Sequence, residues 1–108
     1  MQRLLTLFAA GAIALAGTSL YAQKGDAAKG KEAFDQCSVC HNADSAEVKV
    51  GPGLKGEFKK PKMTSTGKPV TDANILQKIN EGGNGMPAYK DVLSDEEKAN
   101  IIAYLKTL

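Results

Sequence analysis

Apolar residues recur at intervals of three and four in three separate segments of the chain, which is the spacing of one face of a helix. The first segment runs from Asp26 to about Cys37, and the motif that follows is expected to extend or kink this helix. The second begins at Thr71 or Asp72 and continues through Asn80, shortly before two glycines that end it. No segment alternates in the manner of a strand, so the sequence predicts an all-α fold of three to four helices.

The third helix has the clearest boundaries. Ser94 is predicted to be its N-cap, and Glu97, three residues later, completes a capping box. Asp95 and Glu96 suit the positive end of the helix dipole, and Lys106 suits the negative end. The apolar side of this helix is expected to comprise Ile101, Ile102, Tyr104, Leu105 and Leu108.

The segments between the helices, residues 42–70 and 82–92, are predicted to be loops. Residues 42–70 contain seven glycines and prolines and follow neither the helical nor the strand period. A loop of this length is unusual in a small domain unless it wraps something. So small a domain also rarely builds a sufficient core from its own side chains. We therefore expect long loops and helices around a large apolar group.

The first 22 residues differ in composition from the rest of the chain. Arg3 is the only charged residue before Lys24, and a nearly unbroken apolar run leads to small residues. This pattern predicts a signal peptide at 1–22, a single domain at 23–108 and export to the periplasm. An uncleaved membrane anchor is the alternative, although the run is rich in alanine and glycine and only weakly hydrophobic.

Overall charge argues against a nucleic acid as the partner. The chain has 14 lysine and arginine residues against 12 acidic residues, which gives a formal net charge of +2. Proteins that bind nucleic acids usually carry a strong positive excess. Its two cysteines allow one disulfide at most.

The sequence Cys37-Ser38-Val39-Cys40-His41 is the candidate chemical site. A Cys-x-x-Cys-His motif in an exported chain indicates attachment of haem c. Residues three and four apart lie on one side of a helical turn, so both thiols can reach the vinyl groups along one haem edge. His41 would then be the proximal ligand of the iron.

Other chemistries for this motif fit the chain less well. A thiol–disulfide redox pair of the thioredoxin type needs strands and a βαβ pattern, which the sequence lacks. A structural zinc site needs four ligands, and His41 is the only histidine. A disulfide between Cys37 and Cys40 would close a very small loop and stabilise the fold little.

With these residues in view, nearly the whole of 23–108 resembles the class I c-type cytochromes, and it is most similar to their small bacterial members. The resemblance implies the small cytochrome c fold around one covalent haem. The chain has no tryptophan, unlike the larger mitochondrial members. In the family's order, the segments that carry the resemblance are Gly30 with Phe34, Cys37–His41, Gly51–Leu54, Met86–Tyr89, and the last helix with Ile101, Tyr104 and Leu105.

The resemblance also assigns roles to single residues. The carbonyl of Pro52 is expected to accept a hydrogen bond from the non-ligating nitrogen of His41, although a simple turn proline is the alternative. Leu54 is expected to contact the haem. Six apolar residues are candidates for the shell around it: Leu54, Leu76, Ile79, Leu93, Ile101 and Leu105.

The second axial ligand is expected to be Met86. The absence of a second histidine excludes bis-histidine ligation, and glycines before Met86 let the backbone approach a ligand closely. Met63 is the competing candidate, but it follows a lysine-rich run that would have to crowd the haem. Met86 as a mere gap-filling core residue is the remaining alternative.

These residues predict an exported one-electron carrier that passes electrons between redox proteins and is not an enzyme. Two alternatives stay open: a haem subunit of a larger periplasmic oxidoreductase, and a sensor in which a small ligand displaces Met86. Loop lysines can steer a partner with an acidic docking surface, although a solvated loop explains them equally well. They are Lys55, Lys59, Lys60, Lys62, Lys68 and Lys90.

Overall fold

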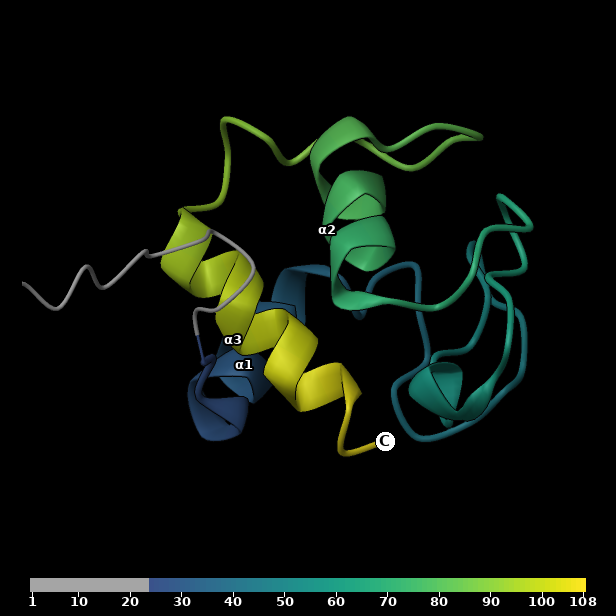
Figure 1. Cartoon of the computed structure of the whole chain (residues 1–108), viewed down its shortest axis with the longest axis horizontal. Coiled ribbons are helices and arrows are strands. Elements are labelled where there is room, and N and C mark those ends of the chain that lie inside the picture. The colour runs from purple at the N-terminus through teal and green to yellow at the C-terminus, as the bar shows by residue number, and fades with distance from the viewer. Residues whose placement is uncertain (1–23) are drawn as a thin grey trace, which may run out of the picture.

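The computed structural model describes residues 24–108, and it is helical there, as predicted (Figure 1). The expected signal peptide or anchor at 1–22 lies outside the described residues. Within them, extended pairing is limited to two isolated bridges, Lys62 with Pro69 and Gly83 with Met86. No helix of this part is long and apolar enough to cross a membrane. The elements are α1 (Ala27–Ala33), η1 (Phe34–Gln36), η2 (Glu57–Lys59), α2 (Asp72–Glu81) and α3 (Asp95–Leu105).

The first predicted helix is present but changes its winding before the cysteines. The carboxylate of Asp26 caps α1 by accepting hydrogen bonds from the backbone N–H groups of Ala28 and Lys29. After Ala33 the chain tightens into η1, where the N–H of Cys37 bonds to the carbonyl of Phe34 at 2.7 Å, three residues back. This closer spacing marks a 3₁₀ turn. The winding therefore changes before the Cys-x-x-Cys-His motif, whereas the sequence predicted an extension or a kink of the helix at the motif itself.

The other two helices begin where the sequence predicts. The Thr71 side chain accepts a hydrogen bond from the N–H of Asn74 and caps α2. Ser94 and Glu97 form the full reciprocal capping box of α3. Both caps are made between residues three apart in the sequence, which is why a local pattern could predict them.

Helices α1 and α3 cross in close contact at Gly30 (Figure 1). A side chain at this position would overlap the backbone carbonyl of Asn100 and come within 2.8 Å of Cβ of Tyr104. Beside the crossing, the rings of Phe34 and Tyr104 pack at 5.5 Å between centroids. The side chain of Asn100 also links α3 to the start of α1, because it accepts a hydrogen bond of 2.8 Å from the N–H of Asp26.

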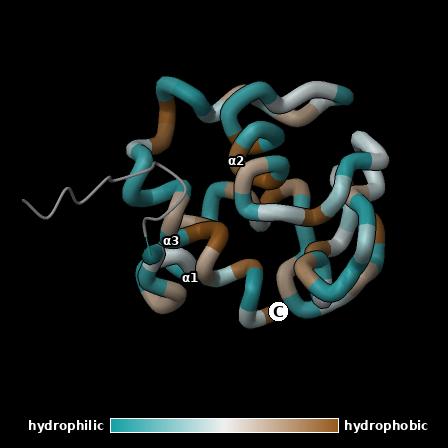
Figure 2. Tube along the Cα trace, in the orientation of Figure 1, coloured by the Kyte–Doolittle hydropathy of each residue, from teal (hydrophilic) through white to brown (hydrophobic). Residues whose placement is uncertain are grey.

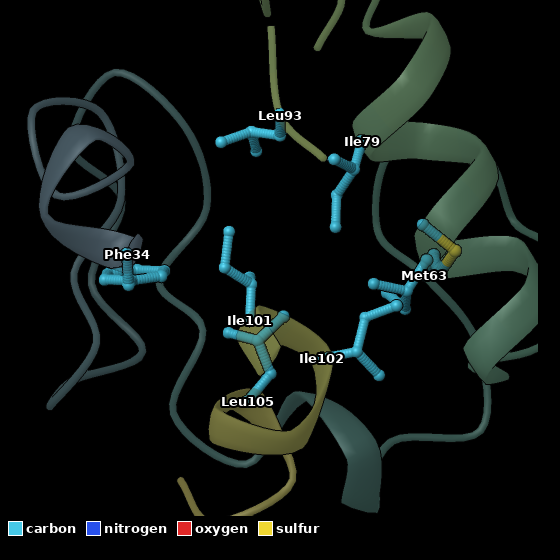
Figure 3. Close-up of a cluster of buried hydrophobic side chains, with 8 residues drawn as sticks. Phe34, Met63, Ile79, Leu93, Ile101, Ile102 and Leu105 are labelled. Carbon is cyan, nitrogen blue, oxygen red and sulfur yellow. The ribbon is translucent and has the colours of Figure 1, made fainter. Parts of the chain in front are cut away.

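The apolar core is small and opens onto an internal space. Along α2 and α3, hydrophobic segments alternate with polar ones, while the outer turns are mostly hydrophilic (Figure 2). Side chains from the end of the first helical segment, from α2 and from α3 point into one interior (Figure 3). The buried hydrophobic residues are Phe34, Met63, Ile75, Ile79, Leu93, Ile101, Ile102 and Leu105.

Candidate functional site

A largely apolar cavity lies at the centre of the fold and is open on one side. Its empty volume, including the open mouth, is about 1150 Å³. Its wall combines residues of α2 and α3 with residues of η1, of η2 and of the segments 37–54, 63–65 and 83–89. The described chain is therefore built around a space that its own side chains do not fill.

Four of the six predicted shell residues line this cavity: Leu54, Ile79, Ile101 and Leu105. Leu76 and Leu93 are not among the lining residues, so their contact with the haem stays a prediction. Leu76 follows Ile75 by one position on α2 and so points about 100° away from it around the helix. Leu93 is buried in the core just before α3 begins.

The Cys-x-x-Cys-His motif forms a tight turn that brings its three functional side chains to the cavity wall. Backbone bonds run from Cys40 N–H and from His41 N–H to the carbonyl of Cys37, at 3.1 and 3.0 Å. Cys37, Cys40 and His41 all line the cavity, whereas Val39 between the cysteines is 69% exposed. The spacing thus produces the one-sided arrangement that the sequence predicted.

The ring of His41 is held from two directions by the loop after it. Its Nδ1 lies 2.8 Å from the carbonyl oxygen of Pro52, so with Nδ1 as donor the Nε2 is free to act as a ligand. A Cβ on Gly51 would lie 2.5 Å from Cε1 of the imidazole, so this loop can pack against the ring only without a side chain. Gly51 N–H also bonds to the carbonyl of Cys40 at 2.7 Å. The predicted Pro52 contact is present, and Gly51 is a positioning residue that the sequence did not reveal.

Met86 reaches the cavity wall from a short turn. Gly83 and Met86 exchange backbone hydrogen bonds of 2.9 and 3.1 Å across the two residues between them. Those two residues, Asn84 and Gly85, have φ values of 55° and 88°. This left-handed pair is typical of the tight turns that favour Asn-Gly.

Two further contacts fix this turn to α2. The ammonium group of Lys78 donates to the carbonyls of Gly82 and Gly83, at 3.1 and 3.3 Å. On the other side of Met86, the N–H of Tyr89 bonds to the carbonyl of Ile79 at 2.9 Å. Met86 is therefore presented by a segment that is anchored at both ends.

Met63 also lines the cavity, which contradicts the argument that its lysine neighbours keep it away. The flanking Lys62 is exposed, but the side chain of Met63 turns inward and is only 5% exposed. Its sulfur lies 3.7 Å from the hydroxyl of Thr66, which donates to it. A loop residue has no periodicity to show which way it points, so the sequence could not predict this. The two methionines differ by their surroundings: Met63 is packed in the core, and Met86 is half-buried on an anchored turn.

The Cys37 thiol lacks the lowered pKa of a reactive cysteine. Burial raises the pKa of the Cys37 thiol, and the charge of Cys40 raises it further. Reactive cysteine pairs depend instead on a lowered pKa. Among residues 24–108 no group of three or more histidine, cysteine, aspartate or glutamate side chains can hold a metal ion. The raised pKa of Cys37 therefore does not support a thiol–disulfide site.

The residues of the cavity fit a haem c. Its apolar wall suits the macrocycle, and two thiols lie on that wall. An imidazole with its second nitrogen free and a thioether supply donors that iron accepts. The fold and the site together define a small haem-binding electron-transfer protein.

Comparison with known proteins agrees with this class. Residues 25–105 match the family model described as cytochrome C oxidase, cbb3-type, subunit III. The chain is 33% identical to cytochrome c2 of Blastochloris viridis, over 89% of this chain and 88% of that protein. It is 31% identical to cytochrome c6 of Leptolyngbya boryana, over 74% of this chain and 89% of that protein.

Solved structures lead to the same family. Cytochrome c6 from the diatom Phaeodactylum tricornutum is similar with a TM-score of 0.59 and 31% identity, covering 77% of this chain and 93% of that one. Cytochrome cH from Methylobacterium extorquens has a TM-score of 0.54 and 31% identity, covering 78% and 100%. The chain belongs to the class I c-type cytochromes. It is an electron carrier with one covalently attached haem c, and not an enzyme.

Proposed function

We propose that the haem lies in the central cavity, bonded to Cys37 and Cys40, with His41 and Met86 as its axial ligands. The observation that carries this proposal is the fixed imidazole of His41, which stands on the cavity wall beside both thiols. When bound, the haem supplies a one-electron ferric–ferrous couple.

In this arrangement each residue has a separate task. The Pro52 carbonyl orients the His41 ring and raises its basicity as a ligand. Met86 supplies a thioether, which raises the reduction potential relative to a second histidine. Leu54 contributes to the apolar wall that keeps water from the iron.

An optical spectrum tests this ligand set. Chain matured in a host with haem c assembly is expected to show, in its ferric form, the weak long-wavelength band of iron–thioether charge transfer. Met86→Ala should remove the band, whereas the matched change Met63→Ala should leave it. A band lost only in Met63→Ala would refute Met86 as the ligand. A wild type that lacks the band, or binds carbon monoxide readily when reduced, would favour a small-ligand sensor.

We propose further that the protein is exported to the periplasm and serves as a mobile carrier for partners with an acidic docking surface. Lys55, Lys59, Lys62 and Lys90 are exposed on the loops, which supports attraction of acidic surfaces. Lys60 contributes less, because its charge is paired with Glu57, whereas Lys68 is exposed and bonds only to the neutral amide of Gln77. Mass determination of the exported protein tests the predicted signal peptide. Loss of residues 1–22 is expected, and an intact chain in the membrane fraction would favour an uncleaved membrane anchor.

A second candidate function is supported by one surface feature. Val39, Val48 and Val50 are between 69% and 76% exposed, and Val50 also lines the cavity. Exposed apolar residues beside a redox centre suit a fixed subunit of a larger oxidoreductase. The family model that matches residues 25–105 carries the name of an oxidase subunit.

The native mass of the full chain, isolated gently from its own host, separates the carrier from the subunit. A monomer supports the mobile carrier. A stable complex that is lost in Val39→Ser with Val50→Ser, but kept in the control Val92→Ser, supports the subunit. Val92 is a suitable control because it is 64% exposed and does not line the cavity.

A further inference from the structure

The wall of the cavity contains a buried carboxylate. Glu57 lies in η2 and is only 4% exposed. It is the sole acidic side chain among the described residues that line the cavity. Carboxylates are rarely buried without a partner, because removing the charge from water is costly. The position of Glu57 on an otherwise apolar wall therefore calls for an explanation.

Glu57 has one charged partner, and the two charges have unequal environments. Nζ of Lys60 lies 3.1 Å from Oε2 of Glu57. The Glu57 side chain is 6% exposed and the Lys60 side chain 40%. Lys60 also donates to the hydroxyl of Thr64 at 2.8 Å. Water therefore screens the lysine charge more than the carboxylate charge. Seen from the cavity, the pair is a net negative group.

The other charged residue of the wall lies elsewhere and has different partners. Lys78, on α2, directs its ammonium group at the carbonyls of Gly82 and Gly83. These bonds engage it with the turn before Met86, and no salt bridge joins it to Glu57 in the described chain. The negative charge of Glu57 is thus offset directly only by the half-solvated Lys60.

We infer that Glu57 lowers the reduction potential of the haem, an inference that rests on the proposed position of the haem in this cavity. A negative charge near the iron stabilises the ferric form, because that form carries one more positive charge than the ferrous form. In a protein interior with an effective dielectric constant of about 20, a unit charge within one haem width changes an equilibrium constant by about tenfold. Lys60 offsets part of this effect, because its positive charge raises the reduction potential of the haem while the charge of Glu57 lowers it.

A redox titration of the haem-loaded protein tests the inference. Glu57→Gln keeps the shape of the side chain and removes its charge. It is expected to raise the ferrous-to-ferric ratio at fixed solution potential by about tenfold, which for a one-electron couple is about 59 mV. Lys60→Met is expected to shift the ratio the opposite way and by less, because its charge is already screened. The exposed acid Glu32 of α1, changed to Gln, is the matched control and should shift it little.

Salt concentration sharpens the comparison. The shift caused by Glu57→Gln should persist at high ionic strength, whereas any shift in the exposed control should vanish. An unchanged or lowered potential in Glu57→Gln, with normal haem content and an intact thioether band, would overturn the inference. The wild-type spectrum is recorded first. It shows whether the haem is attached and Met86 ligates the iron, so an error in the proposed ligand set is distinguished from an error about the effect of Glu57 on the potential. If Glu57→Gln does not fold, Glu57→Met, which is also uncharged and of similar length, is titrated in its place and is expected to raise the potential.

Discussion

Replacing Gly30 by alanine is expected to destabilise the protein, although alanine is the better helix former. In an isolated helix the change would gain about 1 kcal/mol. Here the new methyl group would overlap the backbone carbonyl of Asn100 and lie 2.8 Å from Cβ of Tyr104. A backbone carbonyl cannot turn away as a side chain can, so α1 and α3 must separate. Overpacking of this kind costs about 1–3 kcal/mol, and a fixed obstacle favours the upper end.

The net loss is therefore about 2 kcal/mol, which for a domain of this size lowers Tm by about 8–16 °C. Thermal unfolding of the haem-loaded protein, followed by far-ultraviolet circular dichroism, measures it. Lys29→Ala, at the neighbouring exposed position of α1, is the control and should change stability by less than about 0.5 kcal/mol. An unchanged or raised Tm in Gly30→Ala would show that the helices do not meet closely at this residue.

Three further changes test the supports of the site and of the fold. Gly51→Ala should displace the His41 ring and weaken the hydrogen bond between its Nδ1 and the Pro52 carbonyl. The reduction potential should therefore rise in a redox titration, and an unshifted potential would contradict the contact between Gly51 and the ring. Asn100→Ala should cost about 1–2 kcal/mol in chemical unfolding, because it removes the acceptor for the N–H of Asp26, and a cost near zero would contradict that bond. Ser94→Ala should cost about 1 kcal/mol by loss of the α3 cap, and Ser94→Asp should restore most of it.

Features set by neighbours in the sequence were predictable. The caps of α2 and α3 depend on Thr71 and Ser94, each bonded to a group three residues away. The turn that unites Cys37, Cys40 and His41 depends on spacing alone. The change of winding at Phe34–Gln36 was not predicted, because the helical pattern of the sequence continues to about Cys37.

Features set by the path of the long loop were not predictable. Whether Met63 turns in or out depends on contacts made across residues 42–70, where no period indicates direction. The burial of Glu57 has the same origin, since a carboxylate among lysines looks like solvated surface in the sequence. The need for a glycine at position 51 also depends on a tertiary contact, because the imidazole of His41 occupies the place that a side chain would take.

If His41 and Met86 ligate the haem as proposed, the contacts that hold them suit an electron carrier better than a sensor. The Pro52 carbonyl and the backbone of the same loop hold His41. Lys78 and the N–H of Tyr89 anchor the turn that carries Met86. A sensor needs a ligand that leaves easily, whereas a carrier needs a site that changes little between its two oxidation states. Because both proposed ligand segments are tied to the elements that form the cavity wall, this arrangement would leave little to rearrange when the electron arrives.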